Sequence, residues 1–200
     1  MGCNNSAKKP AQKTLNVSNG NSQNNSENNS EVKVVVLGDA NVGKTSITMQ
    51  YCKNVFQNAY IATIGAAFLQ KRIVKDGNVI NYQIWDTGGS ERFRSMAKIY
   101  YNGAKVAILV CDITDSESLK SLEYWLGEIS KNTQMDNTIM CLACNKIDLE
   151  KERKLTKEMM MEFKNKHNLD LIYDVSAKNN FGIVEMFDEI AELILERQHK

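Results

Sequence analysis

The stretch from Gly38 to Thr45 constrains this chain more than any other. It reads GDANVGKT, a glycine, four residues and then Gly-Lys-Thr, which is the pattern of a phosphate-binding loop. An apolar, β-branched run at 32–37 precedes it and predicts a buried strand, and residues 46–51 have a spacing compatible with a helix. In that setting the loop directs backbone N–H groups at a phosphate, and the helix N-terminus adds partial positive charge. A plain glycine turn with a surface lysine is the alternative, which the flanking strand and helix disfavour.

Two side chains of this loop have expected roles. We expect Lys44 to reach the β and γ phosphates of a nucleotide and the Thr45 hydroxyl to bind Mg²⁺.

Length and charge narrow the class of protein. The 200 residues suffice for one domain with a sizeable core, and a formal net charge of +1 argues against a nucleic-acid-binding surface. No apolar run approaches the roughly 20 residues that span a bilayer, and the polar N-terminus does not resemble a secretory signal. Five cysteines without a repeated spacing favour reduced thiols in a cytosolic protein.

The spacing of Cys141 and Cys144 invites a metal-binding or redox interpretation. Residues 138–144 read as a buried strand, however, and an offset of three residues on a strand directs the two thiols to opposite faces. The chain also lacks a second such pair to complete a zinc site. We therefore expect both cysteines to be core residues.

Residues 1–30 differ in composition from the remainder. Asn, Ser, Gln and Lys dominate, so this segment cannot bury enough apolar surface to offset its ordering entropy, and we expect disorder. Its first residues, MGCNNS, fit the N-myristoylation pattern with Gly2 as the acceptor. Since one myristoyl chain binds membranes only marginally, Cys3 is the expected second signal, as a palmitoylation site.

The remainder, 31–200, alternates strands and helices. This alternation predicts an α/β fold with a doubly wound, mostly parallel six-stranded sheet and about five helices. Lys75-Asp76-Gly77-Asn78 predicts a tight hairpin, and hence one antiparallel edge strand. The expected strands are 32–37, 66–74, 79–85, 105–111, 138–144 and 169–173, and helices are expected near 116–130, 156–167 and 182–197.

Polar motifs fall at the carboxyl ends of these strands, where such sheets bind ligands. Asp86 ends one strand and is expected to hold Mg²⁺ through a water. Asn145-Lys146-Ile147-Asp148 ends another, and the Asp148 carboxylate can accept two hydrogen bonds from guanine, which adenine cannot donate. Ser176-Ala177-Lys178 follows the last strand and can offer a backbone N–H to the guanine O6. Together these motifs indicate guanine-nucleotide binding.

With these motifs, residues 32–196 resemble a Ras-superfamily small GTPase, and more narrowly a Rab protein. The segment ATIGAAFL at 62–69 is similar to the first switch of the early-endosomal Rab branch. The resemblance implies that Thr63 binds Mg²⁺ and the γ phosphate, that the Gly89 N–H senses the γ phosphate, and that Phe56 stacks on the base. It also implies an effector-facing aromatic triad, Phe68, Trp85 and Tyr100, for which plain core packing is the alternative.

These expectations give the following sites. The GTP-contacting residues are Asp39, Ala40, Asn41, Val42, Gly43, Lys44, Thr45, Ser46, Phe56, Thr63, Gly89, Asn145, Lys146, Asp148, Ser176, Ala177 and Lys178. The Mg²⁺ ligands are Thr45, Thr63 and Asp86, and the catalytic positions are Lys44, Gly89 and Ser90. The lipidation sites are Gly2 and Cys3.

The chain departs from the Rab pattern in the second switch. Rabs carry Asp-Thr-Ala-Gly-Gln-Glu there, whereas residues 86–91 read DTGGSE. Ser90 thus stands where the family has the glutamine that orients the attacking water. Because phosphoryl transfer depends on positioning, we expect intrinsic GTP hydrolysis to slow by roughly one to three decades.

A second departure concerns the C-terminus, which reads ERQHK, with no cysteine after Cys144 for the prenylation usual in Rabs. We therefore expect the N-terminal acyl groups to be the membrane anchor. The implied protein is a monomeric GTP/GDP switch on the cytoplasmic face of endosomal or related membranes, with a cytosolic pool. Its implied partners are an exchange factor, a GTPase-activating protein and trafficking effectors.

Two alternatives stay open at this point. A GTP-loaded scaffold with negligible turnover is compatible with Ser90. A phosphotransferase acting on a small molecule would use the same phosphate loop, but the chain is short for a lid or an acceptor site.

Overall fold

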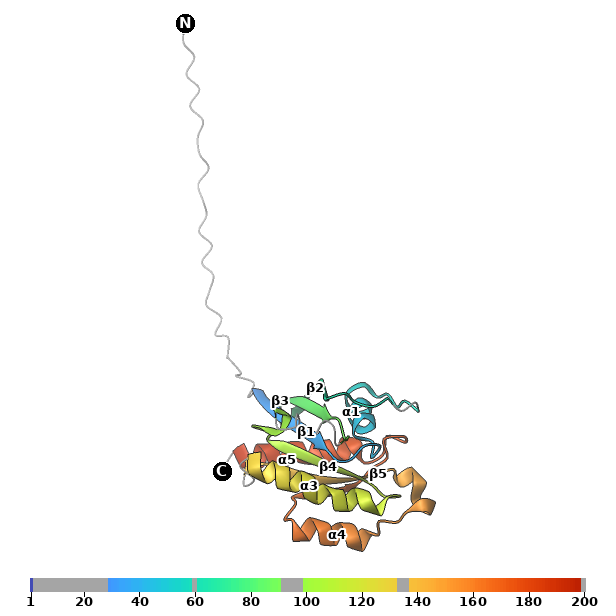
Figure 1. The fold of residues 1–200 in the computed structure, drawn as a ribbon. Coiled ribbons are helices and arrows are strands. Elements are labelled where there is room, and N and C mark those ends of the chain that lie inside the picture. The colour runs from blue at the N-terminus through green and yellow to red at the C-terminus, as the bar shows by residue number, and fades with distance from the viewer. Residues whose placement is uncertain (2–28, 59–60, 91–98, 133–136, 199–200) are drawn as a thin grey trace.

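The computed structural model describes residue 1 and residues 29–58, 61–90, 99–132 and 137–198. The predicted acylation sites Gly2 and Cys3 lie outside the described residues. Six strands form one sheet in the order β2-β3-β1-β4-β5-β6 (Figure 1). The strands are β1 (Asn29–Leu37), β2 (Ala66–Lys75), β3 (Asn78–Thr87), β4 (Val106–Asp112), β5 (Ile139–Asn145) and β6 (Leu171–Asp174).

Parallel pairing brings the carboxyl ends of five strands to one edge of the sheet. β1 pairs in parallel with β3 and β4, and β4, β5 and β6 continue the parallel order. Only β2 runs antiparallel, as a hairpin with β3. The hairpin turn has Asp76 at φ 49° and Gly77 at φ 76°, the paired positive angles that favour Asp-Gly in a two-residue turn. The predicted doubly wound sheet with an antiparallel edge strand is confirmed.

Helices cover both faces of the sheet (Figure 1). Those lying wholly within the described residues are α1 (Lys44–Lys53), α3 (Ser116–Asn132), the 3-10 helix η3 (Ile147–Glu152), α4 (Lys157–Lys166) and α5 (Ile183–Gln198). Tyr51 and Phe187 of α1 and α5 share one core with Val34, whereas Trp125 of α3 packs in the other core with Val35. Because both faces are covered, all residues of β4 and β5 are buried, which explains their continuous apolar sequences.

The two hydrophobic cores, one on each face of the sheet, show the role of Cys141 and Cys144. Cys141 belongs to the core under α1 and α5, and Cys144 to the core under α3 and α4. They therefore point to opposite faces, as predicted.

Within the described residues, no group of three or more His, Cys, Asp or Glu side chains is placed to hold a metal. The same residues contain no helix with the length and hydropathy needed to cross a bilayer.

One boundary and one additional helix differ from the sequence-based prediction. The predicted tail ends at residue 30, but β1 already begins at Asn29, which is in register with Val79 of β3. This extension is polar, so hydropathy gave no signal for it; Asn81 Nδ2 donates to Asn29 Oδ1 at 2.5 Å. The 3-10 helix η3 was not predicted, because its residues have neither the length nor the apolar periodicity of an α-helix.

Two tyrosines in the core offer a test of how the fold is stabilised. Tyr82 Oη donates to the backbone carbonyl of Phe187 at 3.0 Å, whereas the buried Tyr51 hydroxyl has no hydrogen-bond partner among the described residues. Tyr82→Phe should lower the free energy of unfolding by about 1 kcal/mol, since it leaves a buried acceptor with one partner fewer. Tyr51→Phe, the matched control, should leave that free energy unchanged or raise it. Urea unfolding of both variants is the measurement, and an equal loss in the two would contradict this account.

Candidate functional site

A cavity of about 490 Å³ opens at the carboxyl edge of the parallel strands. It is bounded by the loop before α1, the segment between α1 and β2, and the loops after β3, β5 and β6. Most of the residues predicted to contact a nucleotide line it. They are Ala40, Asn41, Gly43, Lys44, Thr45, Ser46, Phe56, Thr63, Gly89, Asn145, Lys146, Asp148, Ala177 and Lys178, together with the predicted catalytic position Ser90.

The glycine loop supplies an electropositive floor to this cavity. Lys44 is only 5% exposed, and its ammonium donates to the carbonyl oxygens of Gly38 at 2.8 Å and Asp39 at 2.6 Å. Burial lowers the pKa of Lys44 to about 8, although the nearby charges of Asp86 and Asp39 partly oppose this shift. Helix α1 starts at Lys44, and its N-cap residue, Gly43, has no side chain to accept hydrogen bonds from the first turn. The first backbone N–H groups of α1 are therefore available to an anion.

Gly43 holds a backbone position that other residues would not tolerate. Its φ is 98°, and a Cβ there would lie 2.2 Å from Asn145 Nδ2. The left-handed angle and the close approach both require glycine. The phosphate loop and the Asn-Lys-x-Asp motif are thus in direct contact across the cavity wall.

Three oxygen-bearing side chains converge beside Lys44. Thr45 Oγ1 donates to Asp86 Oδ2 at 2.6 Å and lies 2.9 Å from Thr63 Oγ1. The other carboxylate oxygen of Asp86, Oδ1, is buried and has no hydrogen-bond partner among the described residues. Burial raises the pKa of Asp86 to about 6, against the opposing effects of the Thr45 hydrogen bond and the Lys44 charge. An oxygen-only donor set with an unpartnered carboxylate oxygen fits Mg²⁺.

Gly89 packs directly against the phosphate loop. A Cβ at this position would lie 2.3 Å from the carbonyl carbon of Asp39 and 2.4 Å from the backbone nitrogen of Ala40. Only glycine allows the loop after β3 to approach so closely. Ser90 follows Gly89 and lines the cavity.

The far end of the cavity is built around Asp148. Ser176 Oγ donates to Asp148 Oδ1 at 2.6 Å, and the Lys178 ammonium lies 3.8 Å from Oδ2. These contacts fix the carboxylate while it faces the cavity. Ser176 itself does not line the cavity. Its backbone N–H donates to the Phe181 carbonyl oxygen, and its role at the site is to position the Asp148 carboxylate.

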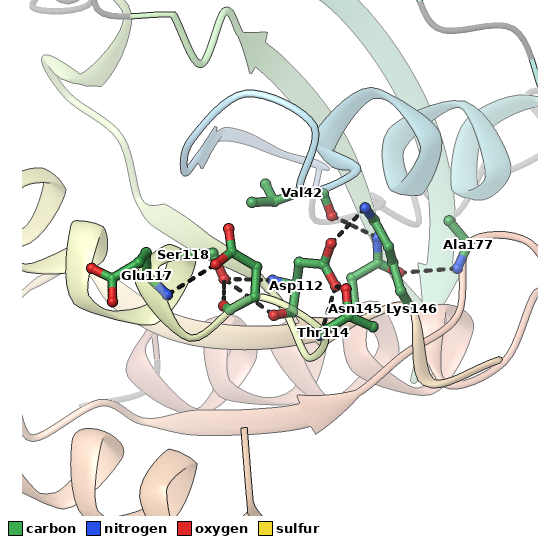
Figure 2. Close-up of polar contacts among 9 residues, drawn as sticks. Val42, Asp112, Thr114, Glu117, Ser118, Asn145, Lys146 and Ala177 are labelled. Carbon is green, nitrogen blue, oxygen red and sulfur yellow. Dashed lines mark hydrogen bonds and ion pairs between the residues drawn. The ribbon is translucent and has the colours of Figure 1, made fainter. Parts of the chain in front are cut away.

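Asn145 joins the two ends of the site (Figure 2). Its side-chain Nδ2 donates to the Val42 carbonyl at 2.9 Å, and its Oδ1 accepts from the Ala177 N–H at 3.2 Å. Asn145 is 1% exposed, so both bonds lie in the protein interior. It therefore connects the phosphate loop to the loop after β6, a role that the motif alone does not reveal.

The remaining predicted residues lie behind the cavity or on the surface. Four of them do not line the cavity but hydrogen-bond to residues that do: Asp39, Val42, Asp86 and Ser176. Phe68, Trp85 and Tyr100 form one contiguous cluster, with ring centroids 5.0 Å apart between Phe68 and Trp85 and 5.2 Å apart between Trp85 and Tyr100. Since Phe68 is 47% exposed, this cluster reaches the surface.

Sequence reasoning missed one contact at this site. The Lys146 ammonium lies 2.6 Å from Oδ2 of Asp112, which ends β4 (Figure 2). The available signal was that Asp112 lies at the carboxyl end of a buried strand, as Asp86 and Asn145 do.

Comparison with known proteins agrees with this geometry. A model of the Ras family matches residues 33–196. The chain belongs to the Ras family. Ras-family GTPases bind guanine nucleotide and Mg²⁺ and hydrolyse GTP.

The similar proteins are Rab-like. Ras-related protein Rab-5B from Plasmodium falciparum is 41% identical, with 98% of this chain and 95% of that protein covered. Ras-related protein RabJ from Dictyostelium discoideum is 41% identical over 84% of this chain and 65% of RabJ. Human Ras-related protein Rab-21 is 41% identical over 82% of this chain and 72% of Rab-21. The chain is thus a Rab-like small GTPase.

Proposed function

We propose that this Rab-like GTPase is a GTP/GDP switch that regulates endosomal vesicle traffic and fusion, with slow intrinsic hydrolysis. The observation that carries the nucleotide assignment is that Lys44 and Asp148 line the same cavity. A phosphate-binding lysine at one end and a guanine-selective carboxylate at the other match one guanosine nucleotide. The likeness to Rab-5B and Rab-21 supports the role in traffic.

Each end of the cavity has a distinct task in this proposal. Lys44 and the loop N–H groups bind the phosphates, and Phe56 stacks on the base whose edge Asp148 reads. Thr45, Thr63 and Asp86 would hold Mg²⁺, which neutralises phosphate charge when bound. Thr63 and the Gly89 N–H sense the γ phosphate, so that hydrolysis changes the segments on either side of the site.

The aromatic cluster is the proposed effector surface. Phe68 on β2 lies five residues after Thr63, and Trp85 on β3 lies four residues before Gly89. A change at either γ-phosphate sensor would therefore be passed along a short stretch of chain to the cluster. The proposed partners are trafficking effectors, an exchange factor and a GTPase-activating protein.

Selectivity for guanine can be tested at Asp148. Asp148→Asn replaces a carboxylate that accepts two hydrogen bonds with an amide that also donates. GDP affinity should fall by roughly two decades or more, and xanthosine diphosphate, which carries a carbonyl where guanine carries its amine, should bind more tightly than GDP. Competition against a fluorescent GDP analogue measures both affinities.

Glu150→Gln is the matched control, because Glu150 is a carboxylate of the same η3 turn that pairs with Arg153 and does not line the cavity. Its preference for GDP should match wild type. An Asp148→Asn variant that still prefers GDP would argue against the assignment.

The hydrolysis rate depends on Ser90 in this proposal. Ser90→Gln should raise the single-turnover rate of GTP hydrolysis by roughly one to three decades, because the longer amide can orient the attacking water. The dissociation rate of GDP serves as the control and should change little. Equal hydrolysis rates in wild type and variant would refute this explanation.

Ser90 also favours a second candidate function, an essentially non-hydrolysing, GTP-bound membrane scaffold that binds effectors. The two functions differ in the nucleotide found on purified protein and in released phosphate. A switch releases phosphate when a GTPase-activating protein supplies the missing group, whereas a scaffold retains GTP.

Membrane residence is proposed to depend on acylation of Gly2 and Cys3, with the protein on the cytoplasmic face of endosomal or related membranes and a cytosolic pool. The match to Rab-5B spans 98% of this chain, so it includes most of the N-terminal residues. Gly2→Ala removes the myristoyl acceptor and should move the protein from the membrane fraction to the cytosol. Asn5→Ala, a change within the same pattern that keeps Gly2, should fractionate like wild type. Unchanged fractionation of Gly2→Ala would count against this anchor.

A further inference from the structure

The carboxylate of Asp112 connects two parts of the molecule. Asp112 ends β4, is 7% exposed, and divides its two oxygens between different partners (Figure 2). Oδ1 accepts from the backbone N–H of Thr114 at 2.9 Å and from its hydroxyl at 2.8 Å. Oδ2 lies 2.6 Å from the Lys146 ammonium. One oxygen thus shapes the turn into α3, and the other is directed at the nucleotide site.

Lys146 needs such support because its backbone is unusual. It adopts φ 70° and ψ 33°, a left-handed conformation that is unfavourable for a non-glycine residue, between Asn145 and the η3 turn that carries Asp148. Lys146 also lines the nucleotide cavity. A lysine stem has many rotamers, so a fixed partner for its charge decides where the stem lies.

The register of β4 against β5 brings the Asp112 carboxylate close to the Lys146 ammonium. Asp112 of β4 is directly opposite Asn145 of β5, and the Ile113 N–H donates to the Asn145 carbonyl at 3.1 Å. The carboxylate is therefore carried by a rigid strand end one residue away from Lys146. Burial on the Asp112 side makes the pair less screened by solvent than a surface pair of equal length.

We propose that Asp112 is a positioning residue for guanine-nucleotide retention: its Oδ2 holds the Lys146 side chain along the cavity wall and thereby slows nucleotide dissociation. The proposal rests on the guanine-nucleotide binding proposed above. It adds a residue that lies outside the phosphate loop and outside the polar motifs at Asp86, 145–148 and 176–178. Asp112 acts through Lys146 and is not assigned any contact with the nucleotide.

The test is the dissociation rate of a fluorescent GDP analogue in the presence of Mg²⁺. Asp112→Asn keeps an oxygen for Thr114 and replaces the oxygen facing Lys146 with an amide that cannot accept from an ammonium. We expect dissociation to become about tenfold faster or more. The change should fall on dissociation rather than on the first-order hydrolysis of bound GTP, a split that general damage to the fold would not produce.

Thr114→Val is the matched control, because it removes one hydrogen bond on the other oxygen of Asp112 without touching Lys146. Its dissociation rate should lie within about twofold of wild type. A double-mutant cycle isolates the pair. Lys146→Gln should itself speed dissociation, and adding Asp112→Asn should then have no further effect.

An Asp112→Asn rate within twofold of wild type, or full additivity with Lys146→Gln, would overturn the inference. If wild-type protein fails to bind the GDP analogue at all, the proposed function fails instead, so the two failures are distinguishable.

A measurement on wild-type protein covers the case in which Asp112→Asn does not fold. The ammonium protons of Lys146, assigned by their loss in Lys146→Gln, should exchange with water more slowly than those of Lys120. Lys120 forms a pair of similar length with Glu117, 2.7 Å, but both side chains are about 70% exposed. Equal exchange rates in the nuclear magnetic resonance spectrum would contradict a fixed Asp112–Lys146 pair.

Discussion

The amide of Asn145 is the contact on which the rest of the site depends. It receives one hydrogen bond from the loop after β6 and donates one to the phosphate loop, and both lie in the interior where they are not exchanged for water. These two hydrogen bonds thus fix the separation of the two ends of the cavity. A rigid wall lowers the entropic cost of binding a ligand there.

Much of the architecture could be predicted from the sequence because its signals are local. The phosphate loop, the Asp-Gly hairpin and the apolar runs of β4 and β5 each specify their own structure. The sites at Asp86 and Asp148 followed from one topological rule, that parallel strands end at the same edge. Comparison with known proteins then placed the chain in the Ras family.

Other features could not be predicted because they arise from tertiary contacts. Asn29 and Ser30 join β1 through backbone pairing with β3, which leaves no hydrophobic pattern. The motif shows that Asn145 is needed, but only the packing shows that it spans two loops. The pairing of Lys146 with Asp112 depends on the register of β4 against β5, and that register is not encoded in any short segment.

The phosphate end of the cavity holds charges in an unfavourable environment. Burial lowers the pKa of Lys44 and raises that of Asp86, so each charged form is destabilised relative to water. Phosphates and a divalent cation would each supply the counter-charge that one of these groups lacks. At the other end of the cavity, the Asp148 carboxylate already accepts a hydrogen bond from the Ser176 hydroxyl.

The pairing of Ser30 with Gln198 has a consequence for which end of the domain is left open. Gln198 Nε2 donates to Ser30 Oγ at 3.1 Å, so the start of β1 and the end of α5 meet at one pole of the domain. The nine residues of β1 then rise roughly 30 Å to the opposite pole, where the phosphate loop begins. The first strand and the last helix of the described fold therefore meet at the pole away from the cavity, so a partner bound at that pole would leave the cavity uncovered.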